Sequence, residues 1–217
     1  RLGVTASFQF RPSDSTLFTF DALYADLDST RTEQFLEIPN LSSGLGGVDI
    51  LDAEIRGPNM VYALFNDIDI RSEQRFDILE TKFKQFTLSM EHNFTDDVQL
   101  TALIGRAESN HDNPVQTTLL WDIADADGVY YDYRGGSRLP VINYGTADVT
   151  NPEAWTLSQI RLRPQSADNS FDNLSADLRW QMTDSTALKF GAQLKKYEFD
   201  TTSARRASET TSAAEQA

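Results

Sequence analysis

Residues 173–196 read NLSADLRWQMTDSTALKFGAQLKK, and this stretch is the strongest indication of the fold. Apolar residues occupy every second position on both sides of a short polar break: Leu174, Ala176, Leu178, Trp180 and Met182 before it, and Leu188, Phe190, Ala192 and Leu194 after it. A period of two belongs to a β-strand with one apolar face, whereas a helix repeats every 3.6 residues. Thr183-Asp184-Ser185 supplies residues that favour tight turns. The stretch therefore predicts an antiparallel hairpin.

The same alternation recurs along the chain. It predicts strands near residues 1–11, 16–27, 77–94, 98–109, 171–182 and 186–199. Short turns at 11–15, 95–97 and 183–185 join these strands in pairs, and long segments at about 28–76 and 108–170 separate the pairs. We therefore predict an all-β fold, built as one antiparallel meander of about six strands. Alternation at 48–56 and 60–70 around Gly57-Pro58 predicts a further hairpin inside the first long segment.

Alternating short and long connections are typical of a transmembrane β-barrel, which has tight periplasmic turns and long outer loops. Ten residues at ~3.3 Å each, tilted ~45°, cover roughly 23 Å, close to the ~25 Å apolar band of such barrels. Aromatic residues lie beside the short turns, as in an interfacial girdle: Phe8, Phe10, Phe18, Phe94, Trp180 and Phe190. The alternative is a soluble β-sandwich used for binding or adhesion, although sandwich loops are usually short at both ends.

The composition narrows the class of protein. The net charge of -14 argues against a nucleic-acid partner, because phosphates require a positive face. There is no cysteine, which excludes disulfides and thiolate chemistry. No run approaches the roughly 18 apolar residues of a membrane helix.

Six strands are too few to close a membrane barrel, since bacterial barrels begin at about 8 strands. Open sheet edges in lipid would leave backbone groups unpaired, at several kcal/mol each. The last residues, 201–217, are polar, do not alternate and are expected to belong to a third long loop. Residues 1–217 are therefore expected to be a partial barrel domain, truncated at both ends.

Three passages carry a family resemblance: RLGVTASFQFRPSDSTLFTFDALYADL (1–27), FNDIDIRSEQRFDILETKFKQFTLSMEHNFTDDVQLTALIGRAES (65–109), and residues 121–199 from WDIADADGVYYDYRGGSRLP to LRWQMTDSTALKFGAQLKKYEF. Together they resemble the barrel of TonB-dependent receptors, and most closely a proteobacterial branch often linked to carbohydrate uptake. The resemblance implies a barrel of about 22 strands around an N-terminal plug, in the Gram-negative outer membrane. Neither the plug nor the TonB box is recognisable in this sequence.

The resemblance also implies a role and a set of partners. The chain would be a segment of a nutrient importer. The expected nutrient is an oligosaccharide, and the alternative is a siderophore or a vitamin. Its partners would be the lipid bilayer, the rest of the barrel, the plug, TonB acting through the plug, and a small-molecule nutrient.

No catalytic constellation is recognisable, so we predict neither an enzyme nor a cofactor. The acidic segment 122–128 invites a calcium interpretation, but an EF-hand loop aligned on Gly128 has Ile123 and Arg134 at ligand positions. An irregular cation site remains the alternative to a solvated acidic loop. His92 and His111 are isolated and predict no metal site. The glycines of 44–47 lack the Lys-Ser/Thr of a phosphate loop and predict a flexible loop.

The second long segment carries the candidate ligand-binding residues. They are Trp121, Tyr130, Tyr131, Tyr133, Asp132 and Arg134, within a wider aromatic and polar group that includes Asp122, Arg138, Tyr144 and Trp155. Aromatic faces with polar neighbours can hold a sugar-like ligand, and the alternative is that these rings pack the loop against itself. The two outer loops, taken as 28–76 and 111–168, contain 17 acidic and 8 basic residues. This excess of negative charge favours a neutral ligand over an anionic one.

Overall fold

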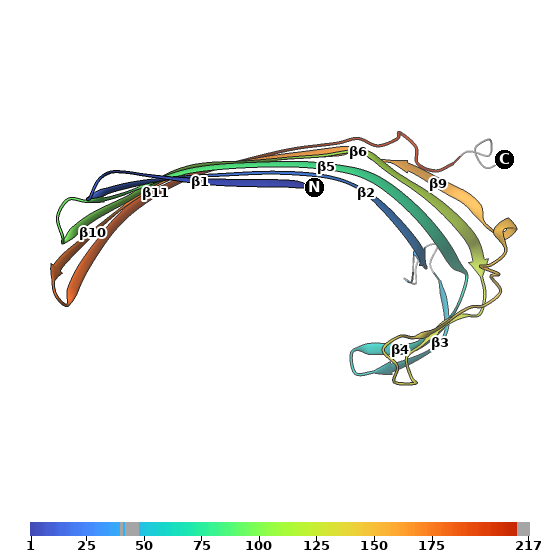
Figure 1. The fold of residues 1–217 in the computed structure, drawn as a ribbon. Helices are drawn as coiled ribbons and strands as arrows, with labels where there is room; N and C mark the ends of the chain where they lie inside the picture. Colours follow the sequence, from blue (N-terminus) through green and yellow to red (C-terminus); the bar gives the residue numbers. More distant parts are fainter. Residues whose placement is uncertain (40, 42–47, 212–217) are drawn as a thin grey trace. The chain divides into compact units, whose positions relative to one another are not determined.

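A computed structural model describes residues 1–39, 41 and 48–211. The strands, labelled in Figure 1, are β1 (Leu2–Ser13), β2 (Thr16–Glu37), β3 (Asp49–Arg56), β4 (Asn59–Asn66), β5 (Ile68–Asn93), β6 (Val98–Ala126), β7 (Val129–Asp132), β8 (Val141–Tyr144), β9 (Thr156–Leu162), β10 (Gln165–Thr183) and β11 (Thr186–Ser203). A short 3-10 helix covers Pro152–Ala154. The predicted all-β antiparallel fold is confirmed. The glycines of 44–47 lie outside the described residues.

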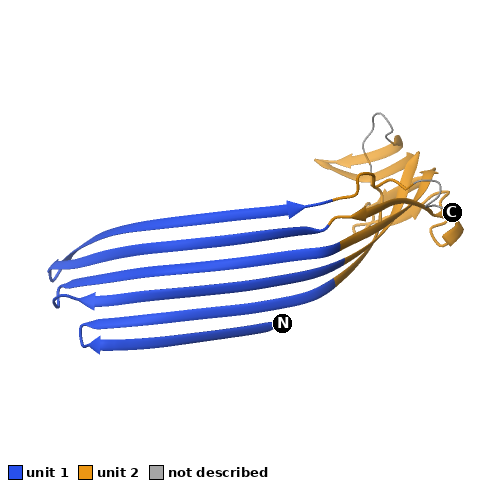
Figure 2. Cartoon of the chain, turned by 90° about the horizontal axis from the view of Figure 1, so that it is seen from above, with its two compact units in different colours: residues 1–30, 77–115, 164–204 blue, residues 31–76, 116–163, 205–217 orange. Residues whose placement is uncertain are grey.

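The chain divides into two compact units, coloured separately in Figure 2. Unit 1 comprises residues 1–30, 77–115 and 164–204. Unit 2 comprises residues 31–76, 116–163 and 205–217, of which the structure describes those up to 211 outside the gaps given above. The division falls within β2, β5 and β6, so each of these long strands contributes one part to each unit.

Unit 1 is a sheet with the strand order β1-β2-β5-β6-β10-β11, which is the predicted meander. Its three short turns lie at the same end of the sheet (Figure 2). Ser13 pairs with Thr16 at the first turn and Thr183 with Thr186 at the last, so each of these connections is about as short as the sequence predicts. Strands β1 and β11 form the two edges.

The register of unit 1 aligns apolar residues with apolar residues. Leu178 pairs with Leu100 on one side and with Phe190 on the other, and Phe8 pairs with Phe20, whose ring stacks on Phe86 at 6.4 Å between centroids. Because directly paired residues point to the same side of a sheet, these residues share one surface. We call this surface the apolar face of unit 1.

The apolar face is exposed. Phe8 is 65% exposed, Phe190 57% and Leu194 69%. The buried residues of unit 1 are Asp77 and Asn113, which are polar and hydrogen-bonded to each other, and no apolar side chain of this unit is buried. Unit 1 therefore has no hydrophobic core of its own, whereas each sheet of a soluble sandwich buries its inner face against the other sheet.

Several strands are longer than predicted, and the segments 28–76 and 108–170 are not simply loops. β2 continues to Glu37, β5 begins at Ile68, β6 continues to Ala126 and β10 begins at Gln165. Most of these extensions carry polar residues on both faces, so the apolar rows do not continue through them; the buried Ile68 and Ile70 of β5 and Leu120 of β6 are exceptions. Backbone hydrogen bonds with a neighbouring strand need no apolar row, and the strand continues where the sequence pattern ends.

Unit 2 contains a second sheet, of order β3-β4-β7-β8. The predicted hairpin at Gly57-Pro58 is confirmed as β3 and β4, with Gly57 at φ +61, the conformation that a hairpin turn of this kind requires at its first central residue. The second strand ends at Asn66 and not at residue 70, because Asp67 has a positive φ of 60 and interrupts it. The hairpin is also not isolated, since β4 pairs with β7.

A hydrophobic core lies within unit 2. Phe65, Ile68, Ile70 and Val129 are almost completely buried, and Trp155 packs against them. A fully buried large apolar side chain contributes roughly 1.5–3 kcal/mol relative to an exposed one. The long segments that the sequence presents as loops thus contain a packed structure of their own.

The polar end of the chain is more ordered than the sequence suggests. β11 continues to Ser203, and residues 209–211 then pair with β9. The Ile160 amide donates to the Glu209 carbonyl at 2.9 Å, and the Thr211 amide donates to the Ser158 carbonyl at 3.0 Å. Residues 205–211 are therefore a docked segment rather than a featureless loop.

Candidate functional site

The predicted ligand-binding residues lie mainly on and just after β7. Tyr130, Tyr131 and Asp132 belong to the strand, and Tyr133 and Arg134 follow it. Trp121 lies on β6, where it pairs with Leu157 of β9, and its side chain is 38% exposed. The structure thus gathers five of the six residues on one short segment of unit 2.

The tyrosines divide between the two faces of the four-stranded sheet. The Tyr130 ring lies 6.2 Å from the Tyr62 ring. Tyr131 lies on the other face, 6.0 Å from Phe65 and 6.1 Å from Tyr133. Its hydroxyl donates to the Met60 carbonyl at 3.2 Å, and burial raises its pKa. Tyr131 therefore packs against the core, whereas Tyr133, 43% exposed, is accessible.

Arg134 is held over an aromatic ring. Its guanidinium carbon lies 3.8 Å from the centre of the Tyr62 ring, a cation–π arrangement. Two hydrogen bonds to Asp132, at 2.9 and 2.6 Å, fix its orientation, and Glu54 lies 3.8 Å away. These bonds from Arg134 lower the pKa of Asp132, which stays ionised. The result is a partly exposed group of a ring and charged edges, suited to stacking and hydrogen bonding with a polar ligand.

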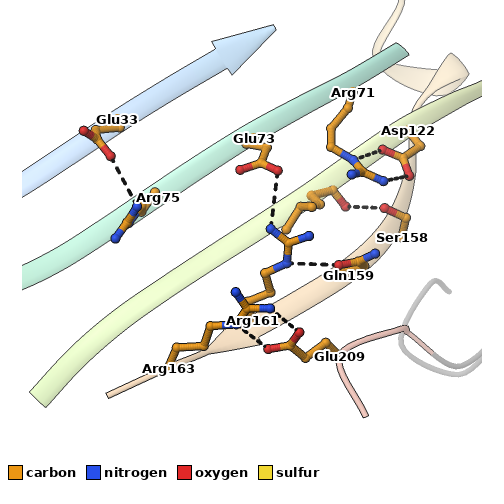
Figure 3. Close-up of polar contacts among 11 residues, drawn as sticks. Glu33, Arg71, Glu73, Arg75, Asp122, Ser158, Gln159, Arg161, Arg163 and Glu209 are labelled. Atoms are coloured by element: carbon orange, nitrogen blue, oxygen red, sulfur yellow. Dashed lines mark hydrogen bonds and ion pairs between the residues drawn. The ribbon is translucent and has the colours of Figure 1, made fainter. Parts of the chain in front are cut away.

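Sequence reasoning missed a series of arginine–carboxylate pairs in unit 2, drawn in Figure 3. Arg71 binds Asp122 through two hydrogen bonds of 2.8 and 2.9 Å. The remaining pairs are Arg75 with Glu33 at 3.8 Å, Arg161 with Glu73 at 3.6 Å, and Arg163 with Glu209 through two hydrogen bonds. Arg71, Glu73 and Arg75 are spaced by two, which puts them on one face of β5. That spacing of opposite charges was the available signal.

Carboxylates of the acidic segment 122–128 have hydrogen-bonding partners within the protein. Both carboxylate oxygens of Asp122 bind Arg71, so this residue is part of an ion pair. Asp127 accepts a hydrogen bond from the Asp67 amide at 3.3 Å, and Asp69 accepts one from the Asp125 amide at 3.4 Å. Among the described residues, no group of three or more His, Asp or Glu is arranged to hold a metal ion.

The two histidines lie far apart in the sheet of unit 1. The Nδ1 atom of His92 is 2.8 Å from the Thr16 hydroxyl, and that of His111 is 2.8 Å from the Thr81 hydroxyl. Each imidazole thus has a hydrogen-bonding partner on a neighbouring strand.

A second candidate surface is the boundary of the apolar face of unit 1. On each of five strands a charged residue lies two positions beyond the same end of the apolar row, after the row on β2, β6 and β11 and before it on β5 and β10. These residues, the charged row, are Asp26, Lys84, Arg106, Asp172 and Lys196. The register places Asp172 directly between Arg106 and Lys196. The apolar row of β10 spans residues 174–182, with Asp172 of the charged row two positions before it. The charged row thus marks one end of the apolar face.

The docked segment 205–211 provides a test of the arginine–carboxylate pairs. Hydrogen bonds from Arg163 lower the pKa of Glu209, so their contribution is present at neutral pH and is lost as the pH falls through this lowered value. Replacing Glu209 with Gln should lower the protection of the Thr211 amide against hydrogen exchange at neutral pH, measured relative to an unstructured amide at the same pH. In this variant the protection should no longer fall as the pH is lowered. Glu153→Gln, in the 3-10 helix, is the control and should leave the exchange unchanged. Equal protection of Thr211 in the wild type and in Glu209→Gln would contradict the role of the pair.

Comparison with known proteins gives no family assignment: no protein-family model matches the chain, and no curated protein matches it. Among the described residues, none of the helical structure is long and apolar enough to cross a membrane.

Proposed function

We propose that the chain is a segment of an outer-membrane β-barrel, and that the barrel is a nutrient importer of the TonB-dependent receptor type. The observation that carries the membrane assignment is the apolar face of unit 1, which is exposed across all six strands and ends at the charged row. Lipid is the environment in which such a face is stable, because an aqueous protein rarely exposes a contiguous apolar patch larger than a few hundred Å².

The alternative of a soluble sandwich is less well supported. A sandwich buries its apolar rows against a second sheet, and no apolar side chain of unit 1 is buried. In the proposed barrel, the edge strands β1 and β11 pair with neighbouring strands of the same barrel, because an unpaired edge is costly in lipid.

For the ligand, we propose a neutral oligosaccharide. Tyr62 and Tyr130 offer rings on one face of the four-stranded sheet, beside the charged edge formed by Arg134, and the exposed Tyr133 offers a ring next to Tyr131. The excess of carboxylates in segments 28–76 and 111–168 disfavours anionic ligands, such as many ferric siderophores, although salt screens this effect beyond about 8 Å. A siderophore or vitamin receptor of the same architecture is the second candidate.

Uptake by cells that express the full-length receptor tests the ligand assignment. Replacing Trp121 and Tyr133 with Ala should lower oligosaccharide uptake about tenfold at limiting ligand, corresponding to roughly 1.4 kcal/mol of lost contact energy. Phe35→Ala is the matched control, since Phe35 is an exposed aromatic residue of β2 outside the group, and uptake should not change. All variants should be present in the outer membrane at wild-type amounts. Retained sugar uptake combined with lost iron-chelate uptake would favour the siderophore alternative.

A further inference from the structure

The side of the unit 1 sheet opposite the apolar face carries mainly polar residues, and we call it the polar face. Four rings interrupt it and form what we call the aromatic band: Phe83, Phe171, Tyr197 and Phe199. Each ring is an odd number of positions from an apolar-face residue of its own strand, as Phe171 is from Leu174, so alternation places it on the polar face. In the described strands of unit 1, no other Phe, Tyr or Trp lies on this face.

The register of β10 and β11 brings three of these rings together. Phe171 pairs directly with Tyr197. The next pair on the polar face, two positions along, joins Asn169 to Phe199. Because directly paired residues lie side by side on one face of a sheet, the three rings occupy two neighbouring rows.

The fourth ring reaches the same level from β5. On the other side of β10, Asn169 pairs with Ser109 of β6. The Thr81 hydroxyl lies 2.8 Å from the Nδ1 atom of His111. The antiparallel order of β5 and β6 therefore puts Phe83, two positions after Thr81, near Ser109, two positions before His111. The aromatic band thus crosses four strands at one level of the sheet.

The band lies where the composition of the two faces changes. Beyond the charged row, the face that was apolar carries Asp168, Glu198 and Asp200. At this level the rings lie on the other side of the sheet. Contact with lipid accounts for the apolar face but not for rings that point away from it. A hydrophobic core does not account for them either, because Tyr197 is 63% exposed and Phe199 55%.

Amide side chains lie beside the exposed rings. The Tyr197 hydroxyl donates to Oδ1 of Asn169 at 2.6 Å, and Nε2 of Gln193 donates to Oδ1 of Asn173 at 3.0 Å. Within the described part of the chain, the Nδ2 groups of both asparagines have no hydrogen-bonding partner and remain available as donors. The nearest charged residue on the polar face of β11 is Lys195, and no carboxylate lies beside it there. Ring faces with amide edges complement a neutral, hydroxyl-rich ligand better than an ion.

We propose that the aromatic band is a second binding site for a neutral oligosaccharide, with sugar rings stacked on Tyr197 and Phe199 and hydroxyl groups bonded to Asn169 and Asn173. The proposal rests on the proposed importer function, in which the polar face lines the lumen. It adds a site on the wall of the barrel to the aromatic residues of β7. Sugar hydroxyls both donate and accept hydrogen bonds, as the amides do.

Oligosaccharide binding by the purified full-length protein tests the proposal. The probes are maltohexaose and xylohexaose, and calorimetric titration in a detergent without sugar groups measures their dissociation constants. The double variant Y197A/F199A should bind the tighter probe about tenfold more weakly, whereas Y197F/F199Y, which keeps both rings, should bind it like the wild type. The matched control is F8A/F190A, which removes two similarly exposed rings from the apolar face and should leave binding unchanged.

Hydroxyl-radical footprinting of the wild type provides a direct readout of the contact. Tyr197 and Phe199 should be oxidised in the protein without probe and protected when the probe is bound. Low reactivity without probe would mean that another part of the protein covers the rings, and would overturn the proposal. Unchanged affinity of Y197A/F199A, or equal weakening in F8A/F190A, would reject the band alone. Failure of the wild type to bind either probe would reject the oligosaccharide assignment as well.

Discussion

Replacing Phe65 with Ala is expected to lower the free energy of unfolding of unit 2 by about 3–5 kcal/mol. Phe65 is 1% exposed and lies in the core with Ile68, Ile70 and Val129, so the truncation leaves a cavity as well as removing buried apolar surface. The fluorescence of Trp155, which packs against this core, reports unfolding in a denaturant titration. We expect the transition to move to lower denaturant concentration.

Phe35→Ala is the control for this experiment. Phe35 is 45% exposed, and substitutions at exposed positions usually change stability by no more than about 0.5 kcal/mol. Similar losses for the two variants would mean that the core of unit 2 does not stabilise it, and that the long segments behave as ordinary loops.

Replacing Leu178 with Arg is expected to destabilise the full-length protein in a bilayer by roughly 2–4 kcal/mol, the cost of a cation near the midplane. Leu178 lies at the centre of the apolar row 174–182 of β10 and pairs with Leu100 and Phe190. The measurement is a denaturant titration of protein refolded into lipid vesicles. The expected loss follows directly from the proposed contact of this row with lipid.

The matched substitution is Gln181→Arg, on the same strand but on the opposite, polar face. In the proposed barrel this position faces the lumen, where a cation stays hydrated, and the loss should be far smaller. Equal costs at the two positions would contradict the membrane assignment. They would not affect the all-β fold, which rests on the strand pairing.

The sequence predicted the parts of the fold in which each strand has one apolar and one polar face. The hairpin of β10 and β11 is the clearest case, because Leu174 to Met182 and Leu188 to Leu194 alternate without interruption. The Gly57-Pro58 hairpin was predicted for a related reason, since the turn residues themselves carry the required conformation. Both signals are local, and local signals can be read from a single chain.

The sequence did not predict the length of β5 and β6 or the interior of unit 2. Arg71, Glu73 and Arg75 form a strand segment without apolar residues on that face, and their partners, including Asp122 and Arg161, are distant in the chain. Similarly, no pattern among residues close in the chain predicts that Phe65 pairs with Val129 or that Glu209 binds Arg163. The candidate aromatic residues were found from composition, but their division into packed Tyr131 and accessible Tyr133 was not.

The sequence by itself therefore determined the period, the turns and the order of the strands, because backbone alternation and turn chemistry act between residues close in the chain. The tertiary structure alone decided which polar segments continue as strands, which aromatic side chains are buried, and which carboxylates form ion pairs with arginines. Those outcomes depend on pairing between strands separated by tens of residues, such as Thr118 with Arg161 and Tyr62 with Asp132. Apolar pattern and turn geometry fix the register of strands that are neighbours in the chain, but they do not identify a partner strand that lies tens of residues away.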